Sequence, residues 1–218
     1  MGKADYRLYV ILDDGRRRSD PAAAALAAIQ GGATMVQWSS GAQSTRVQIE
    51  AGRRLAEVTR SHGVPLVIGG RLDVMLAIGA DGVLLGPQDM PADLARRLAG
   101  RETIIGVLSH DPAEAKAAAE QGADYVLYAG PAEAVAGQVA IPVIAGRLRH
   151  PDEAAAAVQA GAQGVAVAAA HCRGDVAAAC RAFGEAIRQS AARAQQFTAG
   201  ARPFTNEPPF VDGRPGFL

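Results

Sequence analysis

Several short apolar runs in the sequence are followed directly by polar or aromatic side chains that could bind a ligand. These side chains belong to Gln37, Trp38, Ser39, Asp89, Ser109, Tyr128 and Arg147. A few amide, hydroxyl, guanidinium and carboxylate groups in a mostly apolar pocket are the usual means of orienting a small polar molecule. The sequence therefore predicts one ligand pocket whose residues lie far apart along the chain.

Two polar residues could also take part in chemistry. His110 follows the apolar run 105–108 and could act as a general base, because a neutral imidazole accepts a proton near pH 7. Asp89 is a candidate magnesium ligand, but one carboxylate supports this ion only when substrate phosphates supply further ligands. Both residues also have ordinary roles at a helix cap or in a solvated loop. We therefore expect no resident cofactor.

The elements that would position these side chains are marked by a phrase that recurs four times. It begins with Gly-Ala and ends with valine at 32–36, 79–83, 122–126 and 161–165. Each copy follows an alanine-rich run, which predicts a helix closed by a left-handed glycine, a turn and a buried parallel strand. The leading glycines lie 47, 43 and 39 residues apart. This spacing fits two strand–helix units per interval, so the phrases introduce strands two, four, six and eight.

The odd-numbered strands and the helices fit between these phrases. Apolar runs bounded by turn residues predict strands at 9–12, 66–68, 104–107 and 143–145. Helices are predicted at 21–30, 47–61, 72–78, 92–98, 112–120, 151–160 and 176–193, with Asp20 and Asp111 as N-caps before proline. Only residues 129–141 separate the sixth strand from the seventh, so the sixth helix should be short or absent. The predicted fold class is α/β, a (β/α)8 TIM-type barrel over residues 5–193.

The composition changes after residue 193. Residues 194–218 are predicted to be an irregular C-terminal tail, because prolines and glycines interrupt them and no helical or strand period is present. The tail holds four of the five phenylalanines, namely Phe197, Phe204, Phe210 and Phe217. Since burying one phenylalanine contributes roughly 1.5–3 kcal/mol, we expect the tail to bind a surface. That surface belongs to its own barrel, to another copy in a homo-oligomer, or to a different protein partner.

Charge and hydropathy exclude several classes of protein. The 22 basic residues balance 22 acidic ones, and no basic block is longer than 16–18, so we expect no binding to nucleic acid. No run approaches about 18 uninterrupted apolar residues, which predicts no membrane span. The two cysteines lack metal-binding or redox spacing, and no apolar run follows a basic start. We expect a cytoplasmic protein.

The phrases at 10–14, 31–37, 70–76, 80–86, 105–110, 122–126 and 141–145 also occur in a recognisable order. Over about residues 9–187, this order resembles the thiamin phosphate synthase and thiazole tautomerase family, and more closely its tautomerase (TenI-like) branch. The resemblance implies a barrel with its site at the C-terminal ends of the strands. It also implies a small phosphorylated ligand and, for a synthase, a magnesium pyrophosphate.

Transferring the family's site to this chain leaves only part of it in place. Gln37 and Asp89 match the family's pattern, and His110 matches a histidine that the tautomerase branch often carries. Two cations that would meet pyrophosphate correspond to Ser39 and Gly41. The Asn-Asp pair, whose aspartate would hold magnesium, corresponds to the glycines at 69–70.

The remaining positions of the family's site are changed as well. The serine of strand five corresponds to Leu108, and the serine of strand eight to Ala166 or a neighbour. The Gly-Gly turn after strand seven reads Ala-Gly-Arg-Leu at 145–148, and the Thr-x-Thr-Lys loop is missing from the short segment 129–141. The acid/base histidine of the tautomerase falls at 130 or 131, where this chain has glycine and proline. We therefore expect that phosphate is not bound in the family's usual way.

The joint loss of these groups favours a barrel that has lost the family activity and acts as a binding, scaffolding or regulatory subunit. Two alternatives stay open. One is an enzyme of thiamin biosynthesis, either synthase or tautomerase, with a rearranged site. The other is an enzyme that acts on a different small molecule, because barrels of this type host many reactions.

Overall fold

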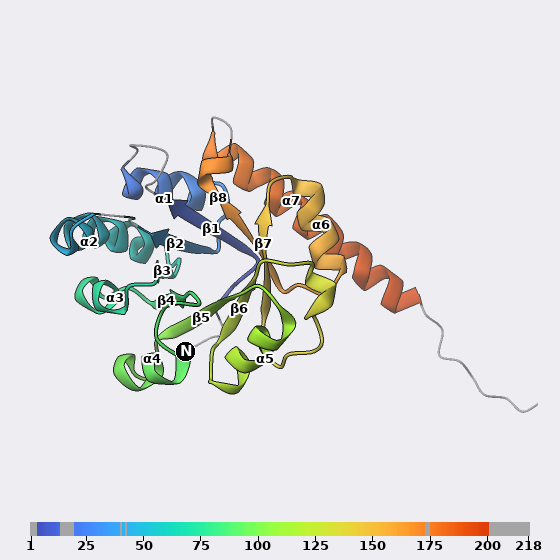
Figure 1. The fold of residues 1–218 in the computed structure, drawn as a ribbon. Helices are drawn as coiled ribbons and strands as arrows, with labels where there is room; N and C mark the ends of the chain where they lie inside the picture. The colour runs from blue at the N-terminus through green and yellow to red at the C-terminus, as the bar shows by residue number, and fades with distance from the viewer. Residues whose placement is uncertain (1–3, 14–19, 40, 42, 173–174, 201–218) are drawn as a thin grey trace, which may run out of the picture.

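The computed structural model describes residues 4–13, 20–39, 41, 43–172 and 175–200, with only the backbone at residue 13 and over 193–200. Eight parallel strands close into a barrel in chain order, and the last strand pairs with the first (Figure 1). The strands are β1 (Leu8–Asp13), β2 (Met35–Ser39), β3 (Leu66–Gly69), β4 (Gly82–Leu85), β5 (Ile104–Ser109), β6 (Tyr125–Tyr128), β7 (Val143–Leu148) and β8 (Gly164–Ala168). The predicted TIM-type fold class is confirmed.

Helices surround the barrel on its outer side (Figure 1). They are α1 (Pro21–Gln30), α2 (Thr45–Ser61), α3 (Leu72–Ile78), α4 (Ala92–Ala99), α5 (Pro112–Glu120), α6 (Pro151–Gln159) and α7 (Val176–Gly200). Between β6 and β7 the chain forms only the short 3-10 helix η1 (Ala132–Ala134). The predicted loss of the sixth helix is therefore confirmed. A second 3-10 helix, η2 (Ala169–His171), follows β8.

The C-terminal helix is longer than the sequence predicted. It was expected to end at Arg193, but α7 continues to Gly200 and runs alongside α6 past the barrel (Figure 1). The residues at 192–199 contain no glycine or proline and favour a helix, so the first stop signal is Gly200. Phe197 is therefore part of this helix. The other tail phenylalanines, Phe204, Phe210 and Phe217, lie outside the described residues, so the predicted docking of the tail stays a prediction.

Helix starts bear out one of the two predicted N-caps. The Asp111 side chain accepts hydrogen bonds from the backbone N–H groups of Ala113 and Glu114, at 2.8 and 2.9 Å, and so caps α5. Asp20 precedes α1 but makes no such bond. Its carboxylate lies instead 3.8 Å from Arg54 of α2. Proline at the first position of α1 already lacks an N–H group, which reduces the need for a cap.

The recurring Gly-Ala phrases have the structure that the sequence predicted. All four leading glycines, at 32, 79, 122 and 161, adopt positive φ angles between 67° and 96°. Each therefore reverses the chain in a conformation that other residues rarely adopt. The strand that follows is β2, β4, β6 or β8 in turn, which confirms the predicted numbering of the strands.

The third residue of each phrase ties its strand to the preceding one. Its side-chain oxygen accepts a hydrogen bond from a backbone N–H at or beside the start of that strand, and its own N–H donates to the same partner's carbonyl. We call this reciprocal pair a strand clasp. The four clasps join Thr34 to Leu8, Asp81 to Leu66, Asp124 to Ile105 and Gln163 to Val143, with side-chain bonds of 3.0, 2.8, 2.7 and 2.7 Å.

Side chains alternate between the barrel interior and the layer beneath the helices, as strand geometry requires. The interior cluster contains Tyr9, Met35, Val67, Leu84, Tyr125, Leu127, Ile144 and Ala166. The larger outer cluster holds the residues that alternate with these along the strands, together with the buried faces of the helices. In the described part of the chain, no helix is long and apolar enough to cross a membrane.

Candidate active site

A cavity of about 300 Å³ opens at the C-terminal ends of β2 and β3. This is the face of a TIM barrel on which active sites are built. The cavity is lined by the connections that follow β2, β3 and β4. One side chain from α2 also lines it. The lining residues are Ser39, Gly41, Gln48, Ile68, Gly69, Gly70, Arg71 and Asp89.

A chain of hydrogen bonds runs through the barrel interior to this cavity. Tyr125 and Tyr9 are joined through their hydroxyls at 2.9 Å. The Tyr9 hydroxyl lies 3.0 Å from Gln37 Oε1, and Gln37 Nε2 donates to Ser39 Oγ at 3.2 Å. Both tyrosines are fully buried, and Gln37 is 5% exposed. Such a buried polar chain holds its members in defined orientations, because breaking any link strands a group without a partner.

Burial keeps the two interior phenols protonated. Removal from water raises the pKa of Tyr9 and of Tyr125 far above the ordinary value for tyrosine. The effect follows from the high cost of placing a phenolate in a medium of low dielectric constant. Each hydroxyl therefore has one proton to donate at neutral pH.

Two glycines shape the floor of the cavity where the family has an Asn-Asp pair. A Cβ atom on Gly69 would overlap Ser39 Oγ and lie 3.2 Å from Gln37 Nε2. A Cβ atom on Gly70, whose φ is +68°, would lie 3.2 Å from Asp89 Oδ2. The Ser39 hydroxyl thus fills the space of a side chain at position 69, and a side chain at position 70 would meet Asp89.

Asp89 is the metal candidate from the sequence. Its Oδ2 accepts a hydrogen bond of 2.7 Å from the backbone N–H of Gly86, and the residue is otherwise exposed. In the described part of the chain, no three His, Cys, Asp or Glu side chains are grouped to hold a metal ion. With Gly70 opposite it, Asp89 does not fit a magnesium ion held by the protein alone. We therefore derive no step through a metal.

Arg71 is a cation of this cavity that the sequence argument did not single out. Its guanidinium binds both oxygens of Asp73, at 2.8 and 2.6 Å, and also donates to Thr45 Oγ1 and Gln48 Oε1. A guanidinium has five N–H donors, so one N–H on Nη1 remains beyond these four bonds among the described residues. The basic residue directly after a strand-end Gly-Gly was the signal that could have identified it.

Trp38 and Tyr128 lie on the opposite side of their strands from the cavity. Both are almost fully buried and belong to the outer cluster beneath the helices. A Cβ atom on Gly52 of α2 would lie 3.1 Å from the Trp38 ring. Since Gln37 and Ser39 point inward, alternation directs Trp38 outward. The structure thus corrects their predicted place in the pocket.

Ser109 and His110 lie at the end of β5 and do not line the cavity either. Ser109 is fully buried, and its hydroxyl donates to the Asp111 carbonyl at 2.8 Å. The His110 ring is 47% exposed, with Nδ1 3.9 Å from Glu114 Oε2, and its backbone N–H donates to the same oxygen at 2.7 Å. The structure therefore does not bring these two residues together with Gln37, Ser39 and Asp89.

Arg147 lies within β7, at the position that corresponds to the family's Gly-Gly turn. It is the one non-glycine residue with a positive φ, +62°, in the described part of the chain. It lies at an irregularity where β7 pairs with β8 and is exposed. This left-handed conformation costs a non-glycine residue of order 1–3 kcal/mol. The backbone at this position therefore keeps the conformation that a glycine would adopt, and the side chain there is an exposed guanidinium.

Comparison with known proteins identifies the family. A family model described as thiamine monophosphate synthase matches residues 8–134. A thiamine-phosphate synthase of Chloroflexus aurantiacus is 41% identical over 197 residues, which cover 81% of this chain and 90% of that protein. This chain belongs to the thiamine monophosphate synthase family. A second thiamine-phosphate synthase, of Moorella thermoacetica, is 36% identical over 181 residues, covering 75% of this chain and 86% of that protein.

A solved structure of the same family supports this assignment. The thiamine phosphate pyrophosphorylase from Pyrococcus furiosus superposes with a TM-score of 0.81 and 30% sequence identity, covering 86% of this chain and 98% of that one. The expectation of a barrel without family activity is contradicted by these relatives, which are named as enzymes. That expectation treated each changed strand-end residue as a loss. The structure shows that Ser39 occupies the space at Gly69 and that Arg71 lines the same cavity.

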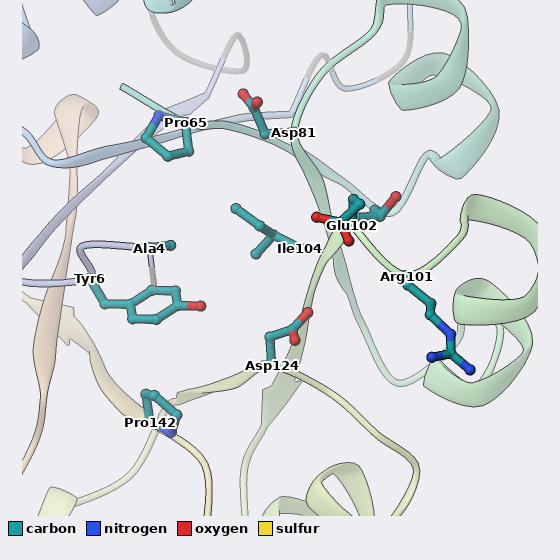
Figure 2. A pocket seen from close by; sticks show the side chains of 10 residues that line it. Ala4, Tyr6, Pro65, Asp81, Arg101, Glu102, Ile104, Asp124 and Pro142 are labelled. Atoms are coloured by element: carbon teal, nitrogen blue, oxygen red, sulfur yellow. The ribbon is translucent and has the colours of Figure 1, made fainter. Parts of the chain in front are cut away.

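A second cavity, of about 400 Å³, lies at the opposite, N-terminal end of this family barrel. Figure 2 shows Tyr6, Asp81, Glu102 and Asp124 around it. The carboxylates of Asp81 and Asp124 are already engaged in strand clasps. Residues at this face of a TIM barrel contribute to stability rather than to chemistry, so the cavity lined by Ser39, Arg71 and Asp89 is the candidate site.

Proposed function

We propose that this chain is an active enzyme of thiamin biosynthesis, which forms thiamin phosphate from the pyrimidine pyrophosphate and the thiazole phosphate, and that it works in the cytoplasm. The observation that carries the proposal is its 41% identity to a protein named thiamine-phosphate synthase, over 90% of that protein's length. A likeness of this extent includes the connections at both ends of the barrel. It favours a kept activity over one that was lost.

The cavity at the C-terminal face can receive phosphate oxygens without the family's two strand-end cations. Ser39 contributes a hydroxyl at the end of β2, and the Gln37 amide, which does not line the cavity, donates to that hydroxyl. Arg71 contributes positive charge and its remaining N–H group. Hydrogen bonds from such donors to charged oxygens are the strong class of hydrogen bond, and they orient a phosphate as well as bind it.

The test is the synthase reaction with the purified full-length protein. We expect thiamin phosphate and pyrophosphate to form in equal amounts from the two substrates, each product being measured directly. The Gln37→Ala variant should lower kcat/KM tenfold or more, because it removes the amide that supports Ser39. The matched control is Gln138→Ala, which removes an exposed glutamine side chain that donates to the Ala134 carbonyl. Absence of both products would overturn the proposal.

A second candidate within the same family is the thiazole tautomerase. It is favoured by His110, which matches a histidine of that branch and presents a half-exposed ring at the end of β5. Proton exchange at the thiazole ring distinguishes this activity from the synthase. Uptake of deuterium from heavy water into the thiazole phosphate, without formation of thiamin phosphate, would assign the chain to the tautomerase branch.

A further inference from the structure

We infer that Tyr9 is a positioning residue for the proposed reaction, because it fixes the orientation of the Gln37 amide so that the Ser39 hydroxyl donates into the cavity. The inference rests on the proposed function. Tyr9 lies in β1, within the barrel, and lines no part of the cavity. It acts through Gln37 and Ser39, which it aligns.

The direction of the hydrogen-bond chain follows from its buried end. Among the described residues, Tyr125 has one hydrogen-bond partner for its hydroxyl, which is Tyr9. Leaving a fully buried O–H without an acceptor is strongly unfavourable, because the group loses its hydrogen bond to water and gains none in return. Tyr125 therefore donates to Tyr9, and the Tyr9 proton is left for Gln37.

The Tyr9 proton then determines which side of the amide faces upward. Tyr9 donates to Gln37 Oε1 at 3.0 Å, so the amide oxygen points into the barrel and Nε2 points towards Ser39. Without this donor, the two orientations of the amide are close in shape and differ only in which atom meets Ser39. Tyr9 thereby excludes the flipped amide, in which Gln37 Oε1 would accept the Ser39 proton and Ser39 Oγ could only accept from a ligand in the cavity.

The consequence for the cavity is a set of donors. Ser39 Oγ accepts from Gln37 Nε2, so its own O–H is released to donate to a ligand at the cavity that Ser39 lines. A site that presents donors favours ligands rich in acceptor oxygens, such as a pyrophosphate. The high pKa values of Tyr9 and Tyr125 keep both protons in the chain at neutral pH.

The test compares two tyrosine variants that lose the same atom. Tyr9→Phe breaks the link to Gln37, whereas Tyr125→Phe removes the far end of the chain and leaves Tyr9 donating to Gln37. Both rings stay. Tyr9→Phe leaves the Tyr125 hydroxyl and Gln37 Oε1 without their partner, whereas Tyr125→Phe removes only the hydrogen bond that Tyr9 accepts, so we expect Tyr9→Phe to lower the melting temperature more. Tyr9→Phe should lower kcat/KM tenfold or more, mainly through a higher KM for the pyrimidine pyrophosphate. Tyr125→Phe should stay within twofold of wild type.

Binding of inorganic pyrophosphate, measured by calorimetry, separates this inference from the proposed function. If wild type binds pyrophosphate but makes no thiamin phosphate, the function fails, and a tenfold weaker binding by Tyr9→Phe still supports the positioning role. Equal effects of the two variants on binding or on KM would mean that Tyr9 acts through stability alone. No binding of pyrophosphate by wild type would also overturn the inference.

Discussion

Ser39 and Gly69 share one volume at the ends of neighbouring strands. A side chain at position 69 has no room beside the Ser39 hydroxyl, and the neighbouring Gln37 amide closes the other side. Because the family's pattern places asparagine at position 69, this chain supplies a polar group to the same space from β2 instead of β3. The two positions are therefore coupled, and a change at one alters the cost of a change at the other.

Substitution at this pair should show that coupling in unfolding measurements. Gly69→Ala alone is expected to destabilise the protein by about 1–3 kcal/mol, because the added methyl group overlaps Ser39. In a Ser39→Gly background, the same substitution should cost less than about 1 kcal/mol. Urea unfolding of the two single variants and the double variant gives the coupling energy. Equal costs in both backgrounds would show that the two side chains do not compete.

The residue scale also shows what the sequence could and could not predict about the site. Gln37, Ser39 and Asp89 were named from phrases next to strands, and they do lie close to one another at the barrel end. Trp38 was named with them although it alternates with two inward residues, so strand periodicity alone could have placed it outside. Tyr9 was missed because a tyrosine in an apolar run is indistinguishable from a core residue until the closed barrel brings β1, β2 and β6 together.

The strand clasps determine how successive elements are held. In each clasp a side chain at the entry to an even-numbered strand binds the backbone of the strand before it, over sequence separations of 15 to 26 residues. Asp124 combines its clasp with an ion pair, because it accepts from Ile105 N–H and also binds Arg96 at 2.6 Å. The Arg96 side chain is only 23% exposed.

Removing the Asp124 clasp should cost far more stability than removing an ordinary surface carboxylate. Asp124→Ala is expected to lower the free energy of unfolding by about 2–3 kcal/mol, since hydrogen bonds to charged groups contribute about 1.5–3 kcal/mol. The matched control is Asp93→Ala, which breaks an exposed ion pair with Arg97 on α4 and should cost about 0.5 kcal/mol or less. Thermal and urea unfolding measure both. A cost for Asp124→Ala no larger than the control would contradict the clasp.

Most elements were predictable because their signals are local. Glycines at the helix ends and alanine-rich amphipathic runs predicted the strands and α-helices within a few residues, apart from the end of α7. The missing sixth helix was predicted from the short segment 129–141. The clasps were not predictable from the phrases, since the same residue types at a turn are expected to bond within the turn. The end of α7 was misplaced because the change in composition begins before the first helix-stopping residue.

At the scale of the whole molecule, buried tyrosine hydroxyls make the free energy of unfolding depend on pH in the alkaline range. Tyr6 packs against Tyr125 with ring centroids 5.1 Å apart, and burial raises the pKa of Tyr6 to about 12. The same cause raises the pKa values of Tyr9 and Tyr125 further. In the unfolded chain these groups ionise near their ordinary value of 10.0.

The folded protein should therefore lose stability as the pH rises above about 10. At pH values between the unfolded and the folded pKa values, the folded state binds more protons than the unfolded state. The contribution of these tyrosines to the free energy of unfolding is therefore complete below this pH range and decreases as the pH rises through it. The slope is about 1.4 kcal/mol per pH unit for each tyrosine that ionises only when unfolded. Urea unfolding from pH 8 to pH 11 measures it, and Tyr125→Phe should make the decline less steep. An unchanged slope in that variant would contradict the assignment.

The four clasps also divide the chain into quarters of similar design. Each quarter contains one strand clasp, and all four clasps lie at the end of the barrel opposite the ligand cavity. A quarter exchanged for its counterpart from another member of the family would therefore carry its own clasp with it, and its two strands would stay joined. Modular exchange of this kind offers a physical route by which the residues at the barrel mouth diverge, one quarter at a time, while the closed sheet beneath them persists.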